Sequence, residues 1–152
     1  MTSLSAGPVE FFSNDHRECD ALWAKVEEAH NSGETDQALA NWKAFVQAMT
    51  RHLAMEEEVL FPAFEEASGM GHGGPGPTMV MRAEHTQMRG VMEQMGEAAK
   101  EGDFDALLDH GDTLMMLIGQ HNMKEESVLY PMASRVLGPE WESLSKKLES
   151  YL

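Results

Sequence analysis

The chain has 152 residues, of which 42% are hydrophobic, and 26 acidic against 11 basic residues give it a formal net charge of −15. This length and apolar content predict a single folded domain spanning residues 1–152, and they exclude a disordered tail. Because so negative a surface repels phosphate groups and anionic lipid, the charge argues against nucleic acid or a membrane surface as a partner.

The N-terminal segment MTSLSAGPVEFF contains neither a basic stretch nor a long apolar run, so no secretory signal is predicted. No part of the chain approaches the roughly 20 apolar residues that a membrane span needs. Cys19 is the only cysteine, which excludes an internal disulfide and a paired-cysteine metal or redox site. We therefore expect a cytoplasmic protein.

Glycine and proline residues divide the chain into predicted helices. Short turns are expected at residues 31–36 and 100–105, where Thr35 or Asp36 and Asp103 are candidate helix caps. A glycine-rich loop at 68–77 separates the two halves, and residues 137–140 precede a short helix over about 139–150. Between these breaks the apolar residues recur at steps of three and four, which predicts a bundle of helices over about 8–136 and no strand.

The second half of the chain repeats the first with an offset of 69 residues and no gap. On the first and third predicted helices, the matched faces are Phe12, His16, Cys19, Trp23, Val26 and Met81, His85, Met88, Met92, Met95. On the second and fourth, they are Phe45, Met49, His52, Glu56, Val59 and Leu114, Ile118, His121, Glu125, Val128. Two repeated helix pairs predict an all-α, up-down-up-down four-helix bundle with pseudo-twofold symmetry.

Six polar residues interrupt these apolar faces at matched positions: His16, His52, Glu56, His85, His121 and Glu125. A buried histidine or carboxylate without a partner costs several kcal/mol, so these groups are expected to be paired or metal-bound. About 16 residues, or about 24 Å of helix, run from His16 to the first turn, and a similar length returns to His52. The copy behaves alike, which predicts that all six side chains meet at one level of the core.

Four imidazoles and two carboxylates are too many donors for one tetrahedral zinc ion, and nitrogen with carboxylate oxygen suits iron or manganese. Two metal ions bridged by Glu56 and Glu125, each also bound by two of the histidines, would use the whole set. This arrangement leaves room for a bridging oxygen and an open position for a small ligand. A site with a single metal ion, a zinc or manganese site, and a hydrogen-bonded core network without metal remain as alternatives.

These residues resemble the pattern of the hemerythrin-like family, also called HHE cation-binding domains, in the subgroup with H…HxxxE…H…HxxxE. The match includes two tails of the form EExxL[FY]P, at Glu56–Pro62 and Glu125–Pro131, and covers about residues 8–136. The resemblance implies a non-haem di-iron centre inside a four-helix bundle. Its two iron ions would be bridged by the glutamate carboxylates and by an oxo or hydroxo group, with zinc or manganese as substitutes.

The sequence departs from the oxygen-carrying members of that family. Their third helix supplies two histidines four residues apart, whereas here Arg89 stands four residues after His85 and Met81 four residues before it. Their last motif ends in an aspartate five residues after its histidine, where this chain has Glu126. The resemblance therefore supports a di-iron site more strongly than reversible oxygen carriage.

The favoured hypothesis is a di-iron protein that binds or processes O2, NO or peroxide. Whether it turns over peroxide or NO as an enzyme is left open. The alternative is an iron-binding or iron-sensing module without turnover, and a third reading is a structural bundle with no metal function.

Three residues next to the six receive separate predictions. Glu57 and Glu126 either orient the histidines, serve as alternative ligands or face solvent, and the sequence does not decide between these roles. Tyr130 lies two helical turns beyond His121, where it would gate the site, donate a proton or electron, or simply pack. Packing is favoured, because the repeat partner of Tyr130 is Phe61.

Other residues near the motifs are expected to play no direct part in metal binding. Cys19 and Met88 should line the pocket, since iron with bridging oxygens prefers harder ligands than sulfur. Three further histidines should lie outside the site: His30, His72 and His110. Pro62 and Pro131 lack an amide hydrogen, so each should kink or end its helix just beyond the ligands.

Overall fold

A computed structural model describes residues 7–69 and 76–152 of the chain, and within these residues it contains helices and no strand. The elements are α1 (Pro8–Asn31), α2 (Thr35–Met55), η2 (Glu56–Leu60), α3 (Phe61–Ser68), α4 (Pro77–Lys100), α5 (Phe104–Lys124), η3 (Glu125–Leu129), α6 (Tyr130–Leu137), η4 (Gly138–Glu140) and α7 (Trp141–Glu149). The prediction of an all-α architecture with a short C-terminal helix is confirmed.

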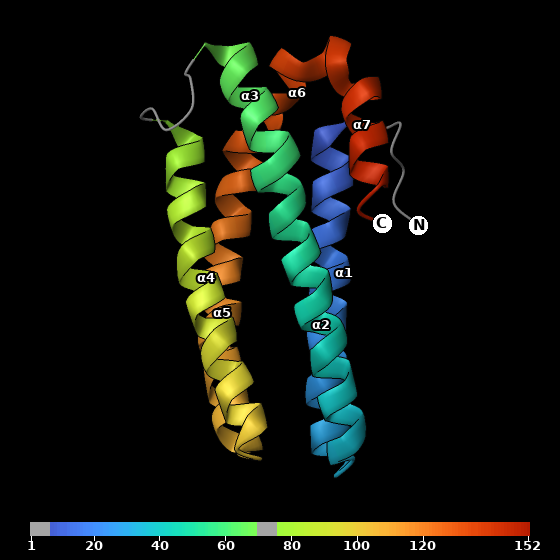
Figure 1. Ribbon diagram of the computed structural model, residues 1–152, viewed down its shortest axis with the longest axis vertical. Helices are drawn as coiled ribbons and strands as arrows, with labels where there is room; N and C mark the ends of the chain where they lie inside the picture. The colour runs from blue at the N-terminus through green and yellow to red at the C-terminus, as the bar shows by residue number, and fades with distance from the viewer. Residues whose placement is uncertain (1–6, 70–75) are drawn as a thin grey trace.

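The helices form two long antiparallel pairs, α1 with α2 and α4 with α5, that stand side by side in an up-down-up-down bundle (Figure 1). Helices α3, α6 and α7 gather at one end of the bundle, where α7 turns back beside that end of α1 (Figure 1). The predicted up-down-up-down arrangement of four long helices is therefore present. None of the described helices combines the length and the apolar character that crossing a membrane requires.

The turns within the two pairs have the same construction. Gly33 and Gly102, 69 residues apart, adopt φ of 75° and 72°, a left-handed conformation that suits glycine at the end of a helix. In the second turn, the side chain of Asp103 accepts a hydrogen bond from the Ala106 amide, so that cap prediction is confirmed. In the first turn, the prediction of Thr35 or Asp36 was wrong: α2 already begins at Thr35, and Glu34 precedes it without a side-chain cap.

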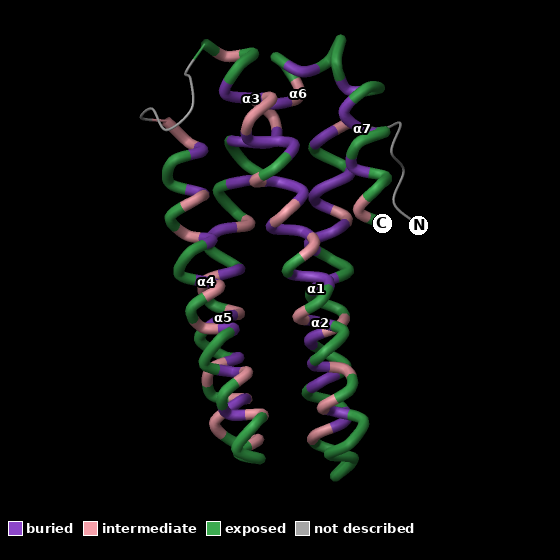
Figure 2. Tube along the Cα trace, viewed as in Figure 1, coloured by how far each residue is buried: buried purple, intermediate pink, exposed green. Residues whose placement is uncertain are grey.

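Buried residues follow the inward sides of all the long helices (Figure 2). The apolar ones form two clusters, one around Phe11, Phe12 and Tyr130 at the α3–α6–α7 end and one around Trp23 and Phe45 along the rest of the bundle. Phe12 in the first cluster and Cys19 in the second lie four residues before and three residues after His16. The apolar core is thus divided by a buried polar layer.

One residue of the predicted apolar faces is not buried. Val59 is 7% exposed, whereas its repeat partner Val128 is 50% exposed. Helix α7 causes the difference, because it packs against η2, where Leu144 joins the same apolar cluster as Val59. The repeat has only one such helix, so Val128 lacks the corresponding cover.

The two segments that begin at Glu56 and Glu125 are π-helical rather than α-helical. Pro62 and Pro131 follow them, each at the start of the next α-helix. The backbone therefore changes its hydrogen-bonding pattern just before each proline and continues as a helix instead of ending. Single π turns are frequent at functional sites, because the extra residue rotates the side chains that follow.

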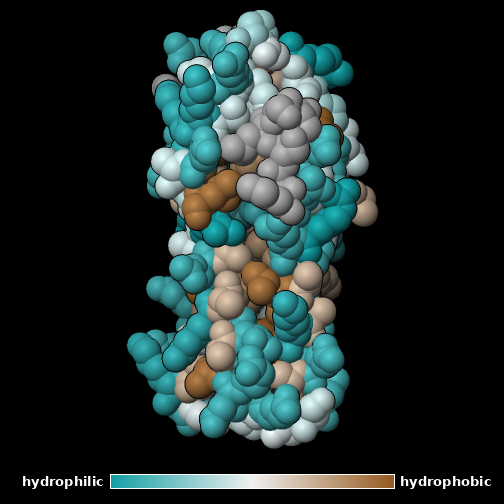
Figure 3. Space-filling view, turned by 90° about the vertical axis from the view of Figure 1, so that its right-hand side faces the viewer, coloured by the Kyte–Doolittle hydropathy of each residue, from teal (hydrophilic) through white to brown (hydrophobic). Residues whose placement is uncertain are grey.

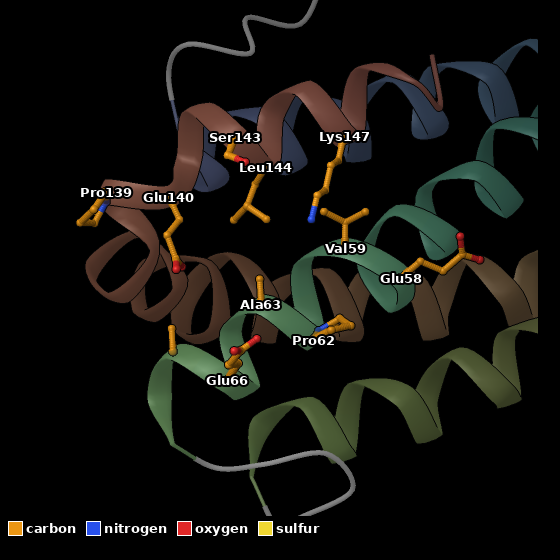
Figure 4. A pocket seen from close by; sticks show the side chains of 11 residues that line it. Glu58, Val59, Pro62, Ala63, Glu66, Pro139, Glu140, Ser143, Leu144 and Lys147 are labelled. Carbon is orange, nitrogen blue, oxygen red and sulfur yellow. The ribbon is translucent and has the colours of Figure 1, made fainter.

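The molecular surface reflects the composition. The face in Figure 3 is mainly hydrophilic, with apolar side chains limited to a narrower run along its length. Beside α7, a hollow of about 630 Å³ is lined by residues of η2, α3, η4 and α7, among them Glu58, Pro62 and Lys147 (Figure 4). None of the six predicted ligand residues lines this hollow.

Candidate metal centre

The six polar residues of the repeated motif meet inside the bundle, and each is at most 4% exposed. Their donor atoms form two overlapping sets, in each of which all atoms lie within 4.8 Å of one another. One set is His16, His52, Glu56 and Glu125, and the other is Glu56, His85, His121 and Glu125. Both sets contain the same two carboxylates, as expected of two metal positions that share bridging ligands.

Each carboxylate lies between one histidine of each set. Oε1 of Glu56 is 3.3 Å from Nε2 of His52 and 3.2 Å from Nε2 of His85. Oε1 of Glu125 is 3.0 Å from Nε2 of His16 and 3.1 Å from Nε2 of His121. Two ligand atoms each about 2.1 Å from a metal ion, and at right angles to each other, would lie about 3 Å apart. The spacing of these donor atoms therefore fits metal ligation.

Several inward-facing atoms of this cluster make no hydrogen bond. Within the described residues, Nε2 of His52, Oε1 of Glu56 and Oε2 of Glu125 are buried without a hydrogen-bond partner. Buried polar groups are normally paired, and an unpaired set at one point marks a position for an ion or a water molecule. The unpaired atoms here are an imidazole nitrogen and carboxylate oxygens, the donors that iron accepts. The residues present thus fit a metal pair.

The outward nitrogen, Nδ1, of each of the four histidines of the site donates to a further carboxylate. The Nδ1 atoms of His16 and His85 lie 2.7 Å from Glu126 and Glu57, respectively. The Nδ1 atoms of the other two histidines complete the pattern: His52 lies 2.7 Å from Asp15 and His121 lies 2.8 Å from Glu84. A hydrogen bond at Nδ1 fixes the tautomer and leaves Nε2 free for a metal ion. Glu57 and Glu126 belong to neither ligand set, and both hydrogen-bond histidines from outside, although Glu126 is also exposed to solvent.

Asp15 and Glu84 were missed in the sequence, although a signal was there. Each immediately precedes the histidine of its own helix, and the two are 69 residues apart. Each bonds not that neighbour but the histidine of the next helix, 37 residues further along. An acidic residue beside the motif in both copies would have indicated a structural role.

The charges of the cluster shift its ionisation strongly. Burial opposes the charged form of His85, but the carboxylates of Glu56 and Glu57 outweigh it and raise the pKa of His85 to about 9. In the same way, Glu56 and Asp15 overcome burial and raise the pKa of His52 well above its ordinary value. Burial would raise the pKa of Glu56, yet the neighbouring histidines hold it well below the usual range. The carboxylate is thus ionised and ready to bind a cation.

Tyr130 does more than pack, so that prediction was wrong. It is fully buried and stacks on Phe12, with ring centroids 5.4 Å apart, but its hydroxyl donates to Oε2 of Glu56 at 2.6 Å. The same hydroxyl is 2.9 Å from Oε1 of Glu125 and 3.0 Å from Nε2 of His16. Burial and the two carboxylates raise the pKa of Tyr130 well above its ordinary value, so it remains a phenol. Its repeat partner Phe61 presents only a ring to His85.

The remaining predicted neighbours lie outside the ligand sets. Cys19 and Met88 are buried one turn beyond His16 and His85, and burial raises the pKa of the Cys19 thiol to about 12. His30 stacks on Phe104 near the end of α1. Neither His30 nor His110 belongs to either set, and His72 lies outside the described residues.

Comparison with family models matches residues 7–133 to the hemerythrin HHE cation-binding domain. This chain belongs to the hemerythrin HHE family. The matched range contains all six residues of the two ligand sets and the hydroxyl of Tyr130. The resemblance drawn from the sequence motifs is therefore confirmed at the level of the family.

The chain is also similar to curated relatives called "Iron-sulfur cluster repair protein YtfE". Those of Yersinia pestis (strain Pestoides F) and Yersinia pseudotuberculosis serotype O:1b (strain IP 31758) are each 28% identical over 149 residues. The match covers 89% of this chain and 66% of each relative, slightly less than two thirds of their length. No solved structure matches the chain.

Proposed function

We propose that the six buried residues hold a pair of iron ions, and that this non-haem di-iron centre binds or processes O2, NO or peroxide. One observation carries the proposal: two four-donor sets share Glu56 and Glu125, so both carboxylates can bridge two metal positions. Two imidazoles and two carboxylates at each position suit iron, with zinc or manganese as substitutes.

The chain's own residues define what such a centre can do. Bound iron would supply an open coordination position and exchangeable electrons for a small ligand. The four outer carboxylates hold the imidazoles in place, and the Tyr130 hydroxyl provides a hydrogen-bond donor at the centre. Because all six ligand residues are at most 4% exposed, the pocket excludes large substrates and most water. These features favour a diatomic gas or peroxide.

A second candidate function is iron handling without turnover. The similarity to proteins named for iron-sulfur cluster repair favours it. Such a module would load and release iron reversibly, and the small ligand would act only as a signal or not at all. The two candidates share the metal pair and differ in what the loaded protein does.

Metal analysis of protein purified without added metal or a histidine tag tests the proposal first. We expect about two iron ions per chain, and reaction of the reduced protein with O2, NO or peroxide on mixing in a stopped-flow instrument. Two irons with no reaction would favour the second candidate. No iron, and none taken up from ferrous iron under anaerobic conditions, would contradict both.

Replacing Tyr130 with phenylalanine should separate metal binding from reactivity. We expect Tyr130→Phe to keep about two metal ions per chain, because no metal donor is removed, and to slow reaction with the small ligand by roughly 10²-fold, the usual effect of losing a positioned proton donor. Stopped-flow rates of the iron-loaded proteins give the measurement. Tyr151→Phe is the matched control, since within the described residues the Tyr151 hydroxyl bonds only Glu58, away from the ligand sets. If iron-loaded Tyr130→Phe reacted with the small ligand as fast as Tyr151→Phe, a role of the Tyr130 hydroxyl in the reaction would be ruled out.

A further inference from the structure

The ligand residues obey the repeat, but the charges around them do not. In the half of the site around the histidines of α4 and α5, each carboxylate that orients a histidine also pairs with a cation. Glu57 bonds His85 and forms an ion pair with Arg89 at 2.5 Å. Glu84 bonds His121 and forms an ion pair with Lys124. The negative charge behind both histidines of this half is therefore compensated.

The half of the site around the histidines of α1 and α2 lacks this compensation. The repeat partner of Arg89 is Asp20, and the partner of Lys124 is Met55, which is buried. Burial raises the pKa of Asp20, while the nearby His16 lowers it and the nearby Glu126 raises it, so Asp20 lies close to both residues. A carboxylate thus stands in this half where the other half has a guanidinium.

Two arginines of the α1–α2 half do not fill the missing role. Arg17 borders the same surface hollow as Glu126, but its guanidinium donates to Asn14 at 2.5 Å. Arg51 forms no ion pair with either outer carboxylate. In the described residues, the ion pairs of Asp15 and Glu126 are those with His52 and His16 alone.

This difference acts on the metal through the imidazoles. A histidine that donates Nδ1–H to an uncompensated carboxylate carries more electron density on Nε2, so it binds a cation more strongly. A cation paired with that carboxylate reduces the electron density on Nε2 again and so weakens the binding of a metal ion. Uncompensated negative charge near the pocket also attracts a metal ion directly, and the attraction is larger in a buried site than in water.

We propose that the two metal positions are inequivalent, with a tightly held ion at His16 and His52 and a weaker, exchangeable ion at His85 and His121. Asp15, Glu126 and Asp20 strengthen the first position, while Arg89 and Lys124 weaken the second. The inference rests on the proposed function, because it requires that a metal pair binds. It assigns separate roles to the two ions: one resident, the other free to exchange.

Stepwise metal loading tests this proposal. Co2+ is titrated into the apoprotein under anaerobic conditions, with competition against a chelator, and crystals holding one equivalent are examined by anomalous diffraction. We expect two dissociation constants at least about tenfold apart, the size of effect typical of outer-sphere partners of metal ligands. The first anomalous peak should lie at His16 and His52.

A charge swap provides the decisive variant. Asp20→Arg combined with Arg89→Asp exchanges the two repeat-related charges and leaves composition and net charge unchanged. We expect the swap to narrow or reverse the difference between the two dissociation constants, with the first anomalous peak moving toward His85 and His121. The single variants Asp20→Asn and Arg89→Gln, which make smaller changes, should each narrow the difference in affinity.

The possible outcomes separate this inference from the proposed function. Two Co2+ ions that fill both positions equally at every ratio would overturn the inequivalence and leave the metal pair standing. A ratio of the two dissociation constants that stays unchanged in the swap and in both single variants would also overturn it. Absence of any Co2+ uptake by the wild-type protein would contradict the proposed function, and the inference with it.

Discussion

Replacement of Glu56 or Glu125 by alanine is expected to eliminate the metal pair. Each carboxylate lies between one histidine of each ligand set, so removing it takes a donor from both metal positions at once. We expect metal content to fall from about two ions per chain to one or fewer in either variant. Mass spectrometry of the purified proteins, supported by anaerobic metal titration, provides the measurement.

The same variants should lose stability. Glu125→Ala leaves His16 and His121 without their buried carboxylate partner and removes a hydrogen-bond acceptor of Tyr130. Breaking a buried charged pair from one side typically costs about 3–5 kcal/mol. Urea denaturation of apoproteins should show a loss of this order in the free energy of unfolding.

Glu58→Ala is the matched control for both measurements. Glu58 stands two residues after Glu56 in the same π-helical segment, but it is exposed, and among the residues that the structure describes its side chain bonds only Tyr151. We expect it to keep its metal and to change stability by less than about 1 kcal/mol. Full metal content in both Glu56→Ala and Glu125→Ala would refute the bridging roles.

The sequence was sufficient to predict the fold and to bring six residues together, because both follow from helical periodicity. The offset of 69 residues relates faces whose burial depends on position along a helix. Helix length alone then set the level at which His16 and His52 meet. Predictions of this kind depend on distances along one helix or between neighbouring helices. The repeat provides each of these predictions twice, and the two copies support each other.

Apart from the helix cap expected at Thr35 or Asp36, the failed predictions concern contacts between helices that the repeat does not relate. Tyr130 and Phe61 occupy matching positions, yet only Tyr130 carries a hydroxyl, and its partners Glu56 and His16 lie 74 and 114 residues away. Val128 was expected to match Val59, but α7 covers only one of them. Side-chain directions of this sort depend on three-dimensional packing, which the periodic pattern does not contain.

Metal affinity is expected to rise steeply with pH, because the same imidazoles bind protons tightly. The carboxylates raise the pKa of His85 from its ordinary 6.5 to about 9 and also raise that of His121. At neutral pH a metal ion must therefore displace protons from nitrogen atoms before it can bind. At pH values below the pKa of a histidine, each proton that the metal displaces lowers the dissociation constant about tenfold for every unit by which the pH rises.

Proton release provides a direct measurement. Calorimetric titration of the apoprotein with Co2+ in two buffers of different ionisation enthalpy gives the number of protons released. We expect at least one proton per metal ion at pH 7, and tighter binding at pH 8 than at pH 6.5. His110→Ala is the control, since His110 belongs to neither ligand set, and it should release the same number.

The stability of the apoprotein should follow the opposite trend. The folded pKa of His85 is about 9 and its ordinary value 6.5, so protonation of His85 stabilises the fold fully below pH 6.5. That contribution is lost as pH rises from 6.5 to about 9. Urea denaturation of the apoprotein across this range should show the decrease, while the metal-loaded protein should not. Metal binding independent of pH, together with constant apoprotein stability, would mean that the carboxylates do not hold protons on these histidines. In that case the positive charge of the metal would not be replacing the charge of protons in the core.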